Sequence, residues 1–343
     1  MTAPARGGRL RAYLLFVAAL LYYLVARSLA RHSAQGFASD PWLGLVEQLM
    51  LVFLLLVGYA VMGFWIDRQN DPVRQQGLPR RPGWRGEAGL GIAVGWGLAA
   101  ASVLPMTVIG GIAIYFSAQA SSWGWLALDA AFFALAALAE EIAFRGYAFQ
   151  CFVRAVGPLG ATLGFAAIYA IVQRPVPGAS TTSFAVALAF TFLLSAAYLR
   201  TRALWVSWGI NFGWKASQAL VFGLALRGVS GNSPVVQGDP MGPFWLTGGA
   251  YGLDGSWFAF VVLLVALPVV FRVTRDLDYL YNAPVIVAGG IPVDLDAAAR
   301  AQHEAAMGPP AAAAPQLIQI GSAAPASAAP APQPSVGRDT DRS

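Results

Sequence analysis

The sequence predicts an all-α protein, a polytopic membrane helix bundle of about eight transmembrane helices. Three observations lead to this fold class. Hydrophobic residues make up 57% of the 343 residues, and charged residues only 11%. Apolar runs of about 15 to 25 residues, close to the length that crosses a bilayer, recur along the chain. The short segments between these runs carry most of the arginines, as loops at a membrane surface do.

Each apolar run marks one expected span. The runs cover residues 12–30, 42–66, 88–116, 123–150, 158–173, 183–199, 203–226 and 256–273. The first run follows several arginines, as a signal peptide would, but no cleavage-like break with small residues comes after it, so we expect a retained span. The chain then divides into an N-terminal two-helix membrane segment with a basic loop (1–84), a transmembrane core (85–275), and an interfacial stretch with a tail (276–343).

The arginines predict the orientation of these spans. The loop from Asp67 to Gly86 holds five arginines, and the N-terminus and the turns at Arg200 and Arg272 are also basic. All four lie on one side if eight spans alternate, and the positive-inside rule makes that side cytoplasmic, together with both termini. Because the basic charge follows the loops, we read it as topology information and expect no nucleic-acid partner.

Two further segments are expected to lie outside the spans. The segment Gly228–Gly255 is rich in Gly, Pro, Ser and Asn and is the one long loop on the outer side. Trp245 and Tyr251 are its expected interfacial anchors. Beyond Pro284, alanine and proline dominate and cannot build a packed core, so we expect a disordered tail.

Cysteine and histidine usage limits the chemistry of the chain. Cys151 is the single cysteine, which excludes a disulfide within the chain. The two histidines, His32 and His303, are too few for an all-histidine metal site.

The most informative segment is Ala139–Tyr147, in which two adjacent carboxylates and an arginine end an otherwise apolar helix. Carboxylates are costly to bury in lipid, so such a cluster indicates a functional site. Glu141 and Arg145 lie one turn apart on nearly the same helix face and can neutralise each other, which leaves Glu140 available. The alternative is an ion pair that only fixes helix packing.

Polar residues of two other predicted helices lie at the depth of Glu140. Glu140 is about 21 Å above the inner end of its helix, and Gln173 is equally far along the next helix. Asn211 and Lys215 are one turn apart on a single face, about 12 to 18 Å above the start of theirs. Lys215 is the only lysine of the chain. A snorkelling side chain would explain it, but its depth favours an ion pair with Glu140.

At this point the chain resembles a known family. It is similar, over about residues 85–225, to the CPBP group, which contains the type II CAAX prenyl endopeptidases and bacterial abortive-infection and bacteriocin-immunity proteins. The first motif of this group is EExxxR, which Glu140, Glu141 and Arg145 match.

The second and third motifs of the group are altered here. The second motif is an aromatic residue followed four positions later by a histidine, whereas this chain has Tyr169 and Gln173. The third motif is HxxxN after a Leu-Trp pair, whereas this chain has Asn211 and Lys215. The resemblance therefore assigns six candidate site residues, of which the last three depart from the family: Glu140, Glu141, Arg145, Gln173, Asn211 and Lys215.

The resemblance also implies a chemistry. In the family, a glutamate and two histidines are taken to hold or activate a water, with zinc, in a cavity open to the inner face of the membrane. Glu140 would be the general base here, and Glu141 with Arg145 the structural pair. The amide oxygens of Gln173 and Asn211 are poor zinc ligands, and the Lys215 ammonium repels a divalent ion. We therefore expect no cofactor, or zinc if the family chemistry survives. Lys215 could replace the positive charge of the metal.

The resemblance implies one function and leaves another open. The first is an intramembrane endopeptidase that acts on membrane-associated peptides or prenylated C-termini, with impaired or lost metal-dependent catalysis. The second is a non-catalytic pseudoprotease that serves as a peptide- or lipid-binding scaffold or an immunity protein. A transporter is disfavoured because no inverted repeat is visible. The expected partners are membrane lipid and membrane-associated peptide or protein, and the expected location is the bacterial inner membrane. The sequence does not determine the oligomeric state.

Overall fold

The computed structural model describes residues 6–68, 70–117, 119, 122–172, 178–231, 233–282, 300 and 302–304. The chain separates into two units, Met1–Ala283 and Pro284–Ser343. The first unit holds all helices and strands discussed below. The predicted tail lies outside the described residues, apart from 300 and 302–304, which are helical.

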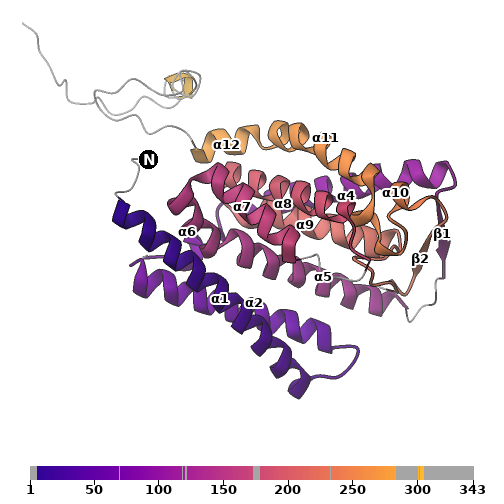
Figure 1. Cartoon of the computed structure of the whole chain (residues 1–343), viewed down its shortest axis with the longest axis horizontal. Coiled ribbons are helices and arrows are strands. Elements are labelled where there is room, and N and C mark those ends of the chain that lie inside the picture. The colour runs from indigo at the N-terminus through magenta and orange to yellow at the C-terminus, as the bar shows by residue number, and fades with distance from the viewer. Residues whose placement is uncertain are drawn as a thin grey trace, which may run out of the picture. The chain divides into compact units, whose positions relative to one another are not determined.

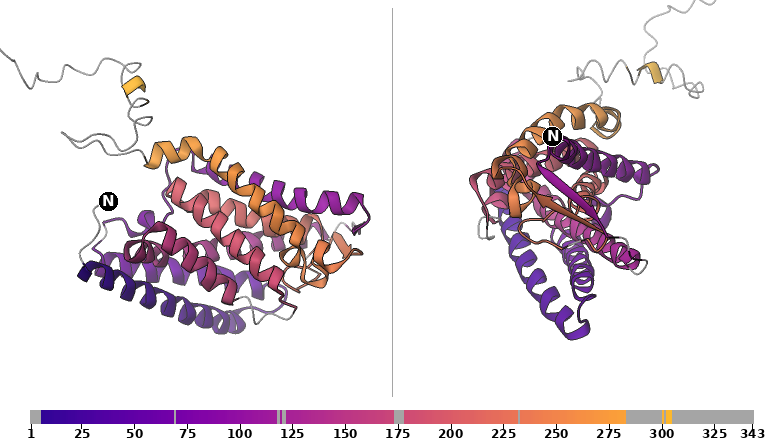
Figure 2. Two further views of the ribbon diagram at one scale, coloured as in Figure 1. Left: turned by 45° about the horizontal axis from the view of Figure 1, so that its top comes forward. Right: turned by 90° about the vertical axis from the view of Figure 1, so that its right-hand side faces the viewer.

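A helix occupies each of the eight predicted spans, and these helices lie side by side (Figure 1, Figure 2). Four of them are long and apolar enough to cross a membrane, namely α1, α2 with the π-helical turn Met62–Ile66 that continues it, α4 and α8. The fold class predicted from the sequence, an all-α membrane helix bundle, is therefore confirmed, while the number of eight crossings stays a prediction. The helices are α1 Arg6–Phe37, α2 Leu43–Val61, α4 Trp84–Val108, α5 Ser122–Arg145, α7 Pro158–Val172, α8 Thr181–Thr201, α9 Leu204–Ala216 and α11 Trp257–Val273.

The third predicted span was too long. Helix α4 ends at Val108, and Ile112–Phe116 forms strand β1, which pairs antiparallel with β2, Val236–Pro240. The apolar run that suggested a longer helix includes this strand. Because its hydrogen-bonding partner lies more than a hundred residues later in the chain, the local pattern could not distinguish the strand from the end of a helix.

The fourth predicted span is interrupted. Helix α5 ends at Arg145, the backbone of Gly146 leaves the helical region with ψ −133°, and α6 follows as a separate helix over Tyr147–Val156. Besides α6, the described part of this unit contains three other short α-helices, which are α3 Pro72–Gln75, α10 Phe244–Thr247 and α12 Arg275–Asn282. Helix α12 covers the stretch that we predicted to be interfacial.

Helices α4 and α9 touch through their backbones. A Cβ atom at Gly91 of α4 would lie 2.3 Å from the carbonyl oxygen of Val206, and one at Gly209 of α9 would lie 2.5 Å from that of Ala88. Small residues allow this close approach between membrane helices. An alanine at either position would push the helices apart. The contact matters for function because α9 carries Asn211 and Lys215.

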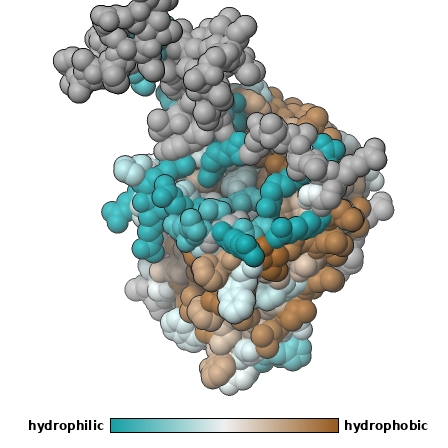
Figure 3. Space-filling model, turned by 90° about the vertical axis from the view of Figure 1, so that its left-hand side faces the viewer, coloured by the Kyte–Doolittle hydropathy of each residue, from teal (hydrophilic) through white to brown (hydrophobic). Residues whose placement is uncertain are grey.

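One end of the bundle is held by ion pairs and is strongly polar. Asp67, which follows α2, lies 2.6 Å from Arg154 of α6 and 3.9 Å from Arg11 of α1. The loop between α2 and α4 therefore lies at the same end as α6 and the start of α1. Figure 3 looks at this end and shows hydrophilic residues gathered over it, above a mainly hydrophobic flank. This boundary is the one expected where a helix bundle leaves the lipid.

Candidate functional site

Glu141 is fixed by two side chains inside the bundle. It is fully buried on α5, and its Oε1 accepts a hydrogen bond from Arg145 Nη1 at 2.8 Å, one helical turn away. The Nδ2 of Asn211, on α9, donates a hydrogen bond to the same oxygen at 2.9 Å. The Glu141–Arg145 pair predicted from the sequence is present, and Asn211 ties it to the neighbouring helix. This arrangement suits a structural role, because both charges are compensated.

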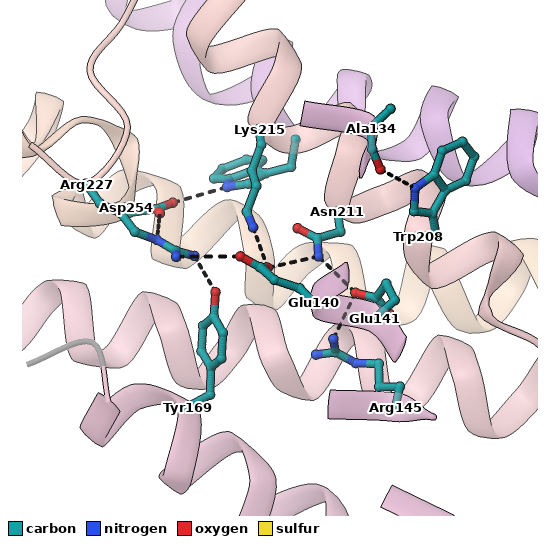
Figure 4. Close-up of polar contacts among 11 residues, drawn as sticks. Ala134, Glu140, Glu141, Arg145, Tyr169, Trp208, Asn211, Lys215, Arg227 and Asp254 are labelled. Carbon is teal, nitrogen blue, oxygen red and sulfur yellow. Dashed lines mark hydrogen bonds and ion pairs between the residues drawn. The ribbon is translucent and has the colours of Figure 1, made fainter. Parts of the chain in front are cut away.

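Glu140 contacts Lys215, as the sequence predicted (Figure 4). The Lys215 ammonium and the Asn211 amide both donate to Glu140 Oε2, the amide at 3.2 Å. The side chain of Glu140 is 26% exposed and that of Lys215 only 4%. The carboxylate is therefore accessible, while the lysine that neutralises it is buried.

Arg227 is a site residue that the sequence analysis missed. It follows α9 and the π-helical turn Ser217–Val221, and its Nη1 lies 4.0 Å from Glu140 Oε1. Its backbone adopts a left-handed conformation, with φ 51°. Glu140 thus has a cation beside each of its two oxygens, Lys215 at one and Arg227 at the other.

A further set of contacts holds Arg227 in place (Figure 4). Asp254, in the 3-10 turn Leu253–Gly255, accepts hydrogen bonds from Arg227 Nε at 3.2 Å and from Trp214 Nε1 at 3.1 Å. Arg227 also donates Nη2 to the hydroxyl of Tyr169 on α7. The sequence held a signal for this contact, because Arg227 directly precedes the predicted loop segment 228–255 and Asp254 lies near the end of that segment.

A cavity of about 340 Å³ lies in front of Glu140. Its polar wall includes Glu140, Lys215 and Arg227, and α1, α2, α5, α7 and Leu226 contribute the rest. The remaining wall is mostly apolar and aromatic. Such a combination of a few convergent charges and aromatic rings suits an amphipathic ligand. The aromatic lining residues are Tyr23, Phe132, Phe133, Phe144 and Tyr169.

The cavity extends away from the arginine-rich end of the bundle. Its lining includes Arg27, in the second half of α1, and Glu47, near the start of α2. Arg27 is exposed and lies sixteen residues beyond Arg11, or about 24 Å along the helix, whereas Arg11 contacts Asp67 at the polar end. Glu140 is therefore reached from the half of the bundle that holds the α1–α2 turn.

The residues around Glu140 do not fit a zinc ion. Oε2 of Glu140 already accepts hydrogen bonds from an ammonium and an amide, and a bound metal would stand against the charge of Lys215. Within the described part of the chain, no group of three His, Cys, Asp or Glu side chains could hold a metal. We therefore derive no chemical step that passes through a metal.

The structure brings together the candidate residues that it describes. Glu140, Glu141, Arg145, Asn211 and Lys215 form one connected set of hydrogen bonds and ion pairs. Gln173 lies outside the described residues, so its expected place beside Glu140 stays a prediction.

The fold and the site define a helical membrane protein with two adjacent carboxylates, one buried and one accessible, that contact an amide and an ammonium of a neighbouring helix. Residues 121–217 match the family model described as "Type II CAAX prenyl endopeptidase Rce1-like". The searches of curated proteins and of solved structures gave no match. The matched segment runs from α5 to the end of α9 and contains all six candidate residues, whereas Arg227 and Asp254 follow it. The match confirms the predicted resemblance over residues 121–217, and together with the long apolar helices it supports a CAAX-protease-like membrane protein.

Proposed function

We propose that this protein binds a membrane-associated peptide or prenylated C-terminus in the cavity in front of Glu140 and has lost metal-dependent hydrolysis. It would act as a non-catalytic member of its family, as a peptide- or lipid-binding scaffold. The observation that carries this proposal is the contact between Lys215 and Glu140, because it neutralises the carboxylate that would otherwise serve as general base.

The shape of the cavity supports binding as the remaining function. Its volume is within the range of small-molecule sites, and its aromatic wall suits a prenyl group or an apolar side chain. The partly exposed Glu140 and Arg227 at its end can orient a polar group of the ligand.

Binding and cleavage can be measured together with a fluorescent farnesylated peptide and the detergent-purified protein. We expect saturable binding, no cleavage, and no effect of a chelator. Ala136→Trp should abolish binding because Ala136 lines the cavity, whereas Ala131→Trp, on the same helix but exposed and outside the lining, should not. Cleavage that requires stoichiometric zinc would instead make the protein an active endopeptidase.

The proposed orientation places both termini in the cytoplasm and the protein in a bacterial inner membrane. The arginines between α2 and α4 support this orientation through the positive-inside rule. The cavity then opens toward the outer half of the membrane, since it extends away from that loop. This differs from the resemblance, which implies a cavity open to the inner face, so the two expectations cannot both hold.

Cysteine labelling of intact cells decides the orientation. In a Cys151→Ser background, a membrane-impermeant maleimide should label Ser230→Cys, which is exposed in the segment after α9, and leave Arg74→Cys, exposed in the α2–α4 loop, unlabelled until the cells are opened. The opposite pattern would reverse the orientation and turn the cavity toward the cytoplasm.

A further inference from the structure

The loop between α2 and α4 forms a concave basic surface separate from the cavity at Glu140. We call residues 70–85, which include α3 and the first two residues of α4, the arginine loop. One hollow of about 500 Å³ is lined by residues 71, 73, 74, 78 and 80–82, and another of about 360 Å³ is lined by residues 80–85. The two hollows share Arg80, Arg81 and Pro82. The arginine loop therefore presents a shaped surface rather than scattered charges.

One arginine of the loop is used to hold the loop in place. Arg81 donates to Glu87 of α4 through Nε at 2.8 Å and Nη2 at 2.7 Å, and to the carbonyl oxygen of Thr201 at the end of α8. The Glu87 side chain is 4% exposed. A bidentate, largely buried pair of this kind fixes geometry as well as charge. The loop is thus pinned to two helices.

The other arginines remain available. Arg74, Arg80 and Arg85 are exposed, and none of them has an ion pair with a carboxylate among the residues that the structure describes. Among the described residues, Asp71 is the only acidic one that lines either hollow, and it accepts a hydrogen bond from the backbone of Arg74 at 3.2 Å. The surface therefore carries an excess of positive charge that is not balanced internally.

Tryptophans place this surface at the edge of the lipid. Trp84 is the first residue of α4, a helix long and apolar enough to cross a membrane, and its ring lies 4.7 Å from that of Trp205. Trp205 donates Nε1 to the carbonyl oxygen of Pro79, and Arg85 lies over the Trp84 ring at 5.5 Å. Tryptophan is enriched at the depth of lipid headgroups, so the arginines lie at that depth too.

We propose that the arginine loop binds the phosphate of an acidic phospholipid in the adjoining leaflet. A guanidinium presents paired donors that match phosphate oxygens, and basic residues next to a membrane helix attract anionic lipids. The two hollows give room for the headgroup, and Trp84 gives an apolar surface for the glycerol backbone. This inference does not depend on the function proposed for the cavity.

The test measures lipid binding to the full-length protein in a neutral detergent. Phosphatidylglycerol added to the micelles should raise the melting temperature and be retained in native mass spectrometry, whereas phosphatidylcholine should do neither. The triple variant R74Q/R80Q/R85Q should bind phosphatidylglycerol at least about tenfold more weakly, since each arginine near an anionic surface raises the binding affinity about fivefold. Its melting temperature without lipid should stay close to that of the unaltered protein, because Arg81 still anchors the loop.

A matched control separates a local site from general charge. The variant R9Q/R272Q/R275Q removes the same charge from exposed arginines outside both hollows and should keep phosphatidylglycerol binding. An equal loss in both variants would overturn the site, as would equal retention of phosphatidylcholine. Inorganic phosphate that stabilises the protein as well as phosphatidylglycerol does would overturn the assignment to lipid.

Discussion

Replacing Glu140 with glutamine should lower the free energy of unfolding by about 3 to 5 kcal/mol, because it leaves the Lys215 ammonium buried without the carboxylate that neutralises it. Lys215→Met should cost less. Glu140 is 26% exposed and keeps Arg227 at 4.0 Å, so its charge is not stranded. The double variant should be milder than the sum of the two, with a coupling free energy of about 0.5 to 3 kcal/mol. Unfolding by SDS in mixed micelles, followed by tryptophan fluorescence, measures all three.

Arg31→Met is the control for this cycle. Arg31 is an exposed cation on α1 outside the cavity, and its loss should change the stability by no more than about 0.5 kcal/mol. Additive losses for the two single variants would show that Lys215 and Glu140 are not coupled. A larger loss for Lys215→Met than for Glu140→Gln would show that Glu140 depends on the lysine more than its exposure suggests.

The helices were predictable because their signal is local. Apolar runs of sufficient length marked each span, and the spacing of one turn marked the Glu141–Arg145 pair. Lys215 could also be matched to Glu140, since a single lysine inside an apolar helix requires a partner at the same depth. In each case, residues close in sequence or at countable helix positions carried the information.

The parts that were missed depend on contacts between distant segments. Strand β1 forms because β2 pairs with it, and its apolar side chains alone predicted a continuation of the helix. Arg227 reaches Glu140, and Asp254 reaches Arg227, because the segment between α9 and α11 folds back onto the bundle. The direction of the cavity likewise depends on how α1 and α2 pack against α5. None of these features has a period that a single segment could reveal.

The same contacts define what would have to change for this protein to bind zinc. The substitutions Gln173→His, Asn211→His and Lys215→Asn together would restore the residues that the family resemblance implies. Position 211 is suitably placed, because the Asn211 amide already lies 3.2 Å from Glu140. We expect the triple variant to bind zinc with a Kd near or below about 1 µM, which corresponds to a binding free energy of about −8 kcal/mol. The unaltered protein should show no stoichiometric zinc binding.

The decisive comparison is between this triple variant and the double variant Gln173→His/Asn211→His, which keeps Lys215. Both contain the two new imidazoles, but in the double variant the ammonium still contacts the carboxylate oxygen that a metal would need. If the lysine occupies the place of the metal charge, zinc should bind the triple variant only, and metal analysis together with isothermal titration should show this. Equal zinc binding by both variants would mean that Lys215 moves aside at little cost. The loss of the histidines, and not the gain of the lysine, would then account for the altered site.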